Sequence, residues 1–177
     1  TGIKKNACIS GYSVNKLGQN SYDFRPYVDY YQWLSPFSEG ARNHIKKLID
    51  ELSKIENLAS VHLDYVRYSD IFLPIKLQPK YGLDQSYEMP EYDFGYHPIA
   101  REMFKKQYGL DPKEIKNDDL KDEWLKFRLD AVTNLVNELT KISHTNGTKI
   151  SAAVFPYPEM ARRMVRQDWA SWNVDLV

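Results

Sequence analysis

Hydrophobic residues recur at helical spacing in several parts of the chain, and a shorter helix is expected after a Pro-Tyr-Pro segment. The predicted helices cover residues 41–55, 98–108, 122–143 and 159–168. Ser35 or Ser38 can cap the first helix, and Pro98 suits the first position of the second. Gly109 and Gly147 are expected to end the second and third helices.

Four short apolar runs predict strands that alternate with these helices. They cover residues 6–12, 60–68, 149–155 and 173–177. Strands that alternate with helices form parallel sheets with helical crossovers. We therefore expect an α/β fold, a parallel (β/α) barrel of TIM type. A complete barrel needs about 250 residues, so residues 1–177 are expected to form one incomplete catalytic domain of about four strands. A small open α/β sheet is the alternative.

A long irregular segment, residues 69–96, follows the second predicted strand. It contains three prolines and two glycines, and loops of this length in compact domains are usually functional or disordered. Its aromatic residues favour an ordered loop on the substrate side of the domain. They include Tyr81, Tyr87, Tyr92, Phe94 and Tyr96.

Composition and motifs exclude several classes of function. The 24 Lys+Arg residues balance 24 Asp+Glu residues, so the chain lacks the basic excess typical of nucleic-acid binders. No apolar run approaches the roughly 20 residues that span a bilayer, and the single Cys8 excludes an internal disulfide. Metal-ligand spacing, a phosphate-binding glycine loop and a nucleophile elbow are all missing from the sequence. We therefore expect neither a cofactor nor a metal.

Aromatic content and one predicted strand indicate a carbohydrate ligand. Aromatic residues make up 14% of the chain, and their rings and polar tips suit sugar rings. Side chains alternate along a strand, so His62 and Asp64 share one face of the strand predicted at 60–68. Asp64 also lies near the carboxyl end of that strand, where barrel enzymes hold catalytic groups. Arg67 either binds substrate or forms a structural ion pair with Asp64.

The same segment resembles a family motif. Residues 62–68, His-Leu-Asp-Tyr-Val-Arg-Tyr, are similar to a strand motif of the glycosyl-hydrolase-like family 10 proteins. Further similar segments are 93–96, 124–128, 151–158, 168–169 and 172–175. The chain departs from the family at Tyr65 and Ser69, where a second Asp and a Pro are common. The resemblance implies a (β/α)8 barrel, hydrolysis of O-glycosidic bonds in bacterial glycan degradation, and a periplasmic, cell-surface or secreted location.

Hydrolysis of a glycosidic bond needs two carboxyl groups. Asp64 is the predicted nucleophile or stabiliser of the transition state. Glu159 follows a predicted strand at its carboxyl end and is the predicted second carboxyl, although an acid there also suits the first turn of a helix. Glu88, Glu91 and Asp93 in the long segment are rivals for that role.

Six other side chains are predicted to contact the saccharide by hydrogen bonds or stacking. They are His62, Arg67, Tyr68, Trp33, Tyr92 and Tyr157. His62 has the alternative role of satisfying Asp64 or a neighbouring backbone group. A non-catalytic glycan-binding module is the alternative function, because binding does not require a second carboxyl. An incomplete barrel exposes sheet edges, so we also expect self-association or poor catalysis by the isolated chain.

Overall fold

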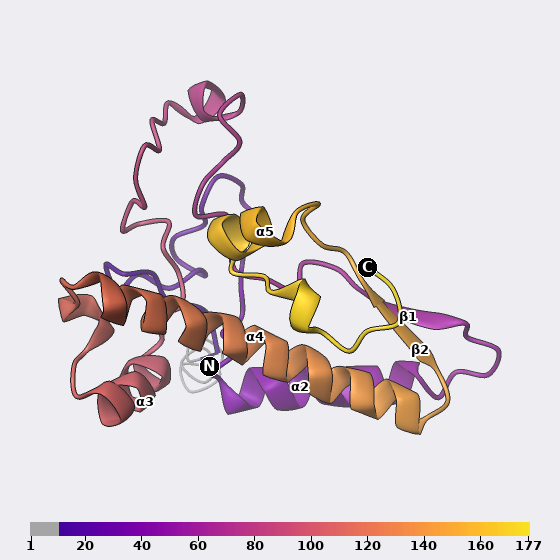
Figure 1. Cartoon of the computed structure of the whole chain (residues 1–177). Helices are drawn as coiled ribbons and strands as arrows, with labels where there is room; N and C mark the ends of the chain where they lie inside the picture. Colours follow the sequence, from indigo (N-terminus) through magenta and orange to yellow (C-terminus); the bar gives the residue numbers. More distant parts are fainter. Residues whose placement is uncertain (1–10) are drawn as a thin grey trace, which may run out of the picture.

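The computed structural model describes residues 11–177 (Figure 1). Within these residues lie four α-helices, one two-stranded sheet and three short 3-10 helices. The α-helices are α2 (Glu39–Leu52), α3 (Pro98–Tyr108), α4 (Asp118–Thr145) and α5 (Pro158–Val165). The strands are β1 (Ser60–Leu63) and β2 (Lys149–Ala152), and the 3-10 helices are η1 (Gln78–Tyr81), η2 (Pro112–Glu114) and η3 (Trp169–Ser171).

Short-range signals decide where the helices begin and end. Ser38 caps α2, because its hydroxyl accepts a hydrogen bond from a backbone N–H of the first turn. α3 begins at Pro98 and ends before Gly109, whose φ is 79°, so the predicted bounds are confirmed. α4 begins before the predicted residue 122 because Asn117 caps it in the same way. The last helix is shorter than predicted and ends at Val165.

The sheet contradicts the predicted barrel. β1 and β2 pair in parallel and make up the whole sheet in the described residues. The predicted strand 173–177 makes only one isolated bridge, from Leu176 to Ser151. The predicted strand 6–12 lies mostly outside the described residues, and Tyr12 makes a single bridge to Leu34. The expectation of a four-stranded segment of a TIM-type barrel is therefore wrong, and the chain is a small mixed α/β protein with a two-stranded parallel sheet.

Both strands are shorter than predicted because the chain leaves the extended conformation early. β1 was predicted over 60–68 but stops at Leu63, and Tyr65 has a φ of 54°. A residue in the left-handed region turns the chain out of the ladder of backbone hydrogen bonds. Strand propensity reports how well side chains suit a half-buried surface. The β-branched and aromatic residues that follow Asp64 therefore pack in a loop instead of extending the strand.

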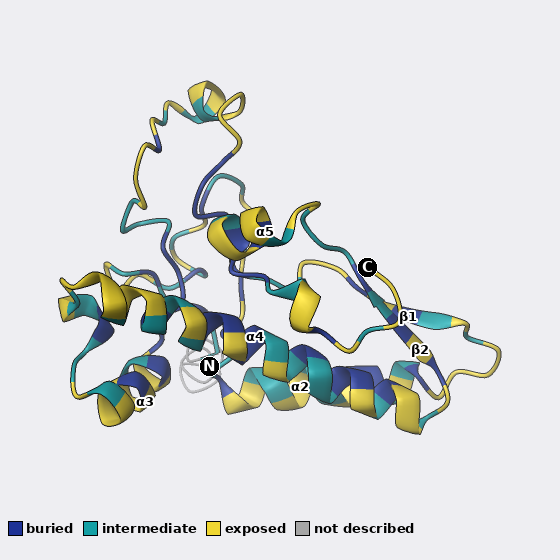
Figure 2. Cartoon of the chain, viewed as in Figure 1, coloured by how far each residue is buried: buried dark blue, intermediate teal, exposed yellow. Residues whose placement is uncertain are grey.

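Helices α2 and α4 lie side by side and cover one face of the sheet (Figures 1 and 2). Val61 and Leu63 are buried on that face, whereas His62 between them is exposed on the other. The main hydrophobic core lies between the two layers. Its buried members include Ile49, Val61, Leu63, Val132, Val136, Leu139 and Ile150. A second cluster joins α3 to the first half of α4 through Tyr96, Ala100, Phe104 and Trp124.

The long loop, residues 69–96, is irregular as predicted except for η1, and its middle part projects away from the helices (Figure 1). Its base is held by Gln85, a buried amide. The oxygen of Gln85 accepts from the backbone N–H of Leu73 at 2.7 Å. Its nitrogen donates to the hydroxyl of Tyr27 at 3.0 Å and to the carbonyl of Ile71 at 3.1 Å. One side chain therefore closes the loop against the Tyr-rich segment near residue 27.

Candidate functional site

Asp64 follows β1 directly, at the carboxyl end of the strand. Its side chain is exposed, and its Oδ1 accepts a hydrogen bond from the backbone N–H of Tyr65 at 2.8 Å. His62 lies on the same open face of the sheet, with Nδ1 2.9 Å from the hydroxyl oxygen of Ser151 on β2. The carboxylate is thus held by its own turn and remains accessible to a ligand.

Arg67 does not pair with Asp64, contrary to one expectation. Its guanidinium donates to the carboxylate of Asp70 at 3.2 Å and to the carbonyl of Tyr68 at 3.0 Å. It also lies within about 5 Å of three aromatic ring centroids, at 5.0 Å from Trp33, 5.2 Å from Tyr65 and 5.3 Å from Phe155. Such cation–π contacts orient the rings. Arg67 therefore serves to hold aromatic side chains beside Asp64.

Trp33 and Tyr65 join two further tyrosines in a cluster that we call the aromatic platform: Tyr30, Tyr31, Trp33 and Tyr65. Their ring centroids lie 5.1 to 6.2 Å apart along the chain of contacts. Trp33 is buried, whereas Tyr30 is 70% exposed and Tyr65 is 46% exposed. Burial and the nearby Asp70 carboxylate raise the pKa of Tyr31 to about 12, so its hydroxyl is protonated at neutral pH.

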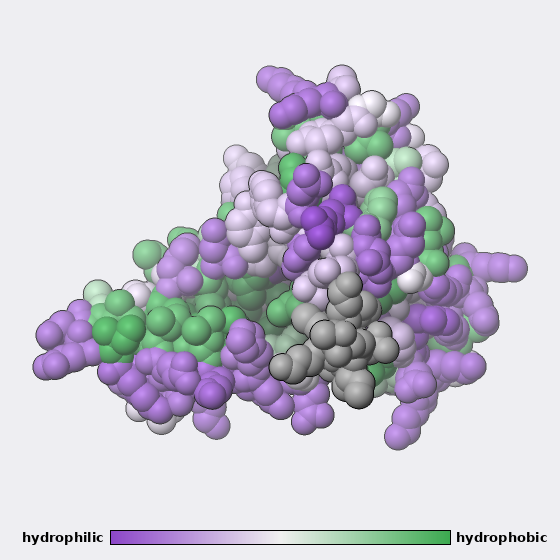
Figure 3. Space-filling view, turned by 180° about the vertical axis from the view of Figure 1, so that it is seen from behind, coloured by the Kyte–Doolittle hydropathy of each residue, from purple (hydrophilic) through white to green (hydrophobic). Residues whose placement is uncertain are grey.

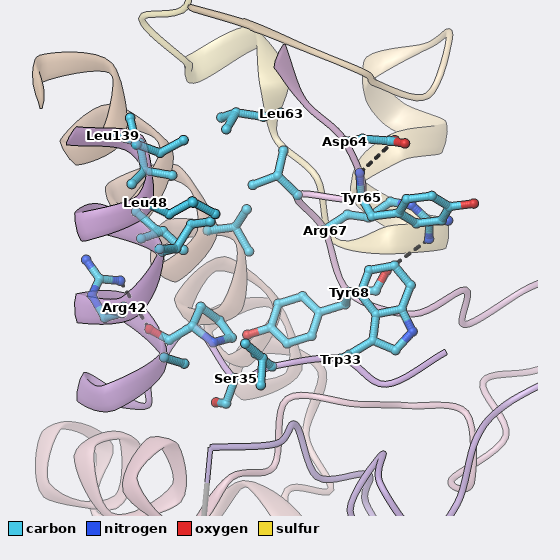
Figure 4. A pocket seen from close by; sticks show the side chains of 18 of the residues that line it. Trp33, Ser35, Arg42, Leu48, Leu63, Asp64, Tyr65, Arg67, Tyr68 and Leu139 are labelled. Atoms are coloured by element: carbon cyan, nitrogen blue, oxygen red, sulfur yellow. Dashed lines mark hydrogen bonds between the residues drawn. The ribbon is translucent and has the colours of Figure 1, made fainter. Parts of the chain in front are cut away.

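A cavity of about 420 Å³ lies behind this platform. Figure 4 shows hydrophobic side chains such as Leu48, Leu63 and Leu139 on one side and Asp64 and Tyr65 on the other. Among its described lining residues, Asp64 is the only acidic one. Figure 3 shows hydrophobic side chains gathering on the back of the molecule; exposed hydrophobic residues that line the cavity are Leu34, Leu48 and Tyr65.

The second predicted carboxyl, Glu159, stands outside the lining of this cavity. It lies in the first turn of α5 and is exposed. Tyr157, which precedes α5, is also exposed. Of the rival acids, Asp93 forms a buried ion pair with Arg128.

Two predicted stacking residues are used in packing. Tyr68 is buried in the main core, so its ring has no free face. The ring of Tyr92 stacks on that of Tyr27, with centroids 4.7 Å apart and an interplanar angle of 7°. Sequence reasoning missed the exposed rings of Tyr30 and Tyr65 and the partly buried ring of Tyr31 between them; the ring of Tyr157 is exposed as well. The tyrosines of the segment 27–31 were the available signal for Tyr30 and Tyr31, but the turn that exposes Tyr65 has no sequence signature.

The described residues contain no group of three or more His, Cys, Asp and Glu side chains arranged to hold a metal ion. None of their helices combines the length and the hydrophobicity that crossing a bilayer requires. The sequence matches no protein-family model and no curated protein. The resemblance of residues 62–68 to the glycosyl-hydrolase-like family 10 motif therefore stays a prediction.

Proposed function

We propose that the chain binds an oligo- or polysaccharide at the carboxyl edge of the sheet and that Asp64 takes part in hydrolysis of an O-glycosidic bond there. The observation that carries this proposal is the exposed carboxylate of Asp64 beside the half-exposed ring of Tyr65. Aromatic faces stack on the C–H faces of sugars, and a carboxylate accepts hydrogen bonds from their hydroxyls.

In this proposal Asp64 is the nucleophile or stabilises the oxocarbenium-like transition state. A second carboxyl must protonate the leaving oxygen, at roughly 5–5.5 Å for retention of configuration or 6.5–9.5 Å for inversion. The carboxyl ends of parallel strands lie at the same edge of a sheet. Glu159 is exposed in the first turn of α5, the helix that follows β2, so it is the proposed partner.

A non-catalytic glycan-binding module is the second candidate. It is favoured by the cavity itself, whose described lining contains Asp64 and no other acid. Binding needs only stacking and hydrogen bonds, which the platform, Asp64 and His62 supply. The two candidates differ in whether a bond is broken, so one set of variants distinguishes them.

The test compares wild type, Asp64→Asn and Tyr65→Ala on a panel of defined polysaccharides. Reducing ends report hydrolysis, and calorimetry reports binding. We expect Asp64→Asn to abolish turnover while binding persists, and Tyr65→Ala to weaken binding about tenfold through loss of stacking. The exposed Asp130→Asn on α4 is the control, since among residues 11–177 its carboxylate has an ion pair with the exposed Lys126 and none with a residue of the cavity.

Saccharide binding without turnover by the wild type would favour the binding module. Unchanged turnover in Asp64→Asn would eliminate the catalytic assignment. Circular dichroism checks that each variant is folded, and the exposed position of Asp64 makes large structural effects of this substitution unexpected.

A further inference from the structure

A second cavity lies between α4 and the base of the long loop. It shares no described lining residue with the cavity beside the aromatic platform. Its volume is about 360 Å³, within the range of roughly 300–1,000 Å³ typical of small-molecule sites. Arg128 and Arg166 line it together with the buried Asp93. Its other charged lining residues are Lys16, Lys121, Glu88 and Asp122.

The two arginines share one buried carboxylate. Arg128 donates to Asp93 at 2.5 Å and to the carbonyl of Phe94 at 3.0 Å. Arg166 reaches the same Asp93 oxygen only at 3.6 Å. The hydroxyl of Tyr96 also donates to Asp93, at 2.9 Å. The hydrogen bonds of Asp93 thus go to Arg128 and Tyr96, and its contact with Arg166 is a longer ion pair without a hydrogen bond.

The carboxylate nearest to Arg166 is that of Glu88, a residue of the long loop. Its Nη2 lies 2.9 Å from Oε1 of Glu88. The side chain of Arg166 is 2% exposed, whereas that of Glu88 is 41% exposed. A buried cation thus has its closest counter-charge at the protein surface, where water screens the pair.

On one edge of the Arg166 guanidinium, one of the two donor nitrogens contacts an acceptor among residues 11–177 and the other does not. Nε and Nη2 lie on the same edge of the group and together bind a carboxylate or phosphate in bidentate fashion. Here Glu88 engages Nη2, while the buried Nε has no hydrogen-bond partner among the described residues. The buried hydroxyl of Tyr68 also lacks one. A buried donor without a partner is destabilising, so a ligand oxygen that accepts from it gains a hydrogen bond without displacing one.

The pKa directions of the two guanidiniums agree with this difference. Burial lowers the pKa of Arg128, but Asp93 and Tyr96 more than offset burial, so the net pKa is raised. Burial and repulsion from Arg128 lower the pKa of Arg166, and Asp93 and Glu88 offset only part of this effect. The electrostatic environment of Arg166 therefore accommodates a further negative charge.

We infer that this cavity binds a small oxyanion, a carboxylate or phosphate group, which takes the bidentate edge of Arg166 in place of Glu88. Lys16 supplies additional positive charge at the cavity wall. The site is separate from Asp64 and does not depend on hydrolysis. Glu88 acts as an internal competitor, because its carboxylate occupies part of the position that the ligand takes.

The experiment measures binding of sodium glucuronate and of inorganic phosphate to the whole chain by calorimetry at low ionic strength. Glucose is the neutral counterpart of glucuronate. We expect at least one anion to bind and glucose not to bind. Preference for glucuronate indicates an acidic sugar as the natural ligand, and preference for phosphate indicates a phosphorylated one.

Variants then assign the site. Arg166→Met should weaken anion binding about tenfold or more, because it removes a charged bidentate contact. Glu88→Gln should strengthen binding several-fold and leave the fold intact, because its side chain is half-exposed. Lys54→Met, which breaks the exposed ion pair with Asp50 away from the cavity lining, and Asp64→Asn should both leave anion binding unchanged.

The inference is overturned if neither anion binds, or if both bind equally well to Arg166→Met and wild type. If Arg166→Met fails to fold, Glu88→Gln decides: an unchanged affinity overturns the inference. The two proposals are separable, because loss of hydrolysis at Asp64 with intact anion binding contradicts only the first.

Discussion

The backbone of Tyr65 determines how the Asp64 carboxylate is presented. At a φ of 54°, Tyr65 is one of four described non-glycine residues with positive φ, a conformation that costs of order 1–3 kcal/mol. The turn ends the strand and leaves the ring of Tyr65 half-exposed next to the guanidinium of Arg67. The cation–π contact compensates part of the strain. Backbone strain at this point is consistent with a functional turn.

Gly95 provides a prediction at the same scale. Its φ is 114°, and an added β-carbon would lie 2.6 Å from Cδ of Arg128 and 3.2 Å from Cε1 of Tyr68. Arg128 cannot move aside, because Asp93 and the carbonyl of Phe94 hold its guanidinium. We predict that Gly95→Ala lowers the free energy of unfolding by about 2–5 kcal/mol, from strain and overpacking together.

Gly82→Ala is the matched control for this prediction. Gly82 has a φ of 65°, and its added β-carbon meets no atom of the described residues within 4 Å. It should therefore lose only about 1 kcal/mol from the left-handed backbone. Urea unfolding measures both variants, and equal losses would contradict the crowding argument.

At the scale of elements, the buried amide of Gln85 closes the long loop, and the amide of Gln78 joins the same network. Gln85 links three backbone or hydroxyl groups from Leu73, Tyr27 and Ile71, and the loop otherwise contains only the short helix η1. A loop with few buried contacts opens locally when such a clamp is removed. The clamp therefore controls the order of the segment that carries Glu88.

We predict that Gln85→Ala makes the loop susceptible to trypsin at Lys76 and Lys80, which are both exposed, before the rest of the chain is cut. The loss in unfolding free energy should be about 1–3 kcal/mol from unsatisfied buried groups. Gln107→Ala, at an exposed position of α3, is the control. Mass spectrometry identifies the first cut, and identical digestion patterns would count against the clamp.

At the scale of the whole molecule, Asp93 joins the long loop to α4 and α5. Burial raises the pKa of Asp93, but Arg128 and Arg166 and the hydrogen bonds from Arg128 and Tyr96 outweigh burial, so the net pKa lies below its usual value. A carboxylate whose pKa is lowered by folding stabilises the native state above its unfolded pKa, near 4. That contribution is lost as the pH falls through the folded pKa.

We predict that wild-type stability decreases steadily below about pH 4 and that Asp93→Asn removes this part of the pH dependence. At pH 7 the variant should be less stable by about 3–5 kcal/mol, because it leaves buried guanidiniums uncompensated. Urea unfolding from pH 3 to 7 measures both effects. Parallel pH profiles for the two proteins would show that Asp93 is not the group responsible.

Local signals in the sequence predicted the helices well. Caps and apolar spacing depend on residues a few positions apart, so Ser38, Pro98 and Gly109 could be assigned without a fold. Strand propensity likewise predicted that Asp64 lies near the carboxyl end of a strand, and in the structure it directly follows β1. The strand count was wrong, because pairing needs a partner elsewhere in the chain and an unbroken extended backbone.

The sequence by itself therefore determined the helices, the long loop and the position of Asp64 near the carboxyl end of a strand, whereas the exposure of its carboxylate, which was expected to point into a barrel, came from the tertiary structure. Only the tertiary structure decided which rings stay accessible, that Arg67 pairs with Asp70, and that Arg128 and Arg166 converge on Asp93. In the sequence, Arg128 is 35 positions and Arg166 is 73 positions from Asp93. Their energies depend on burial and on the competition of several charges, which no local pattern encodes.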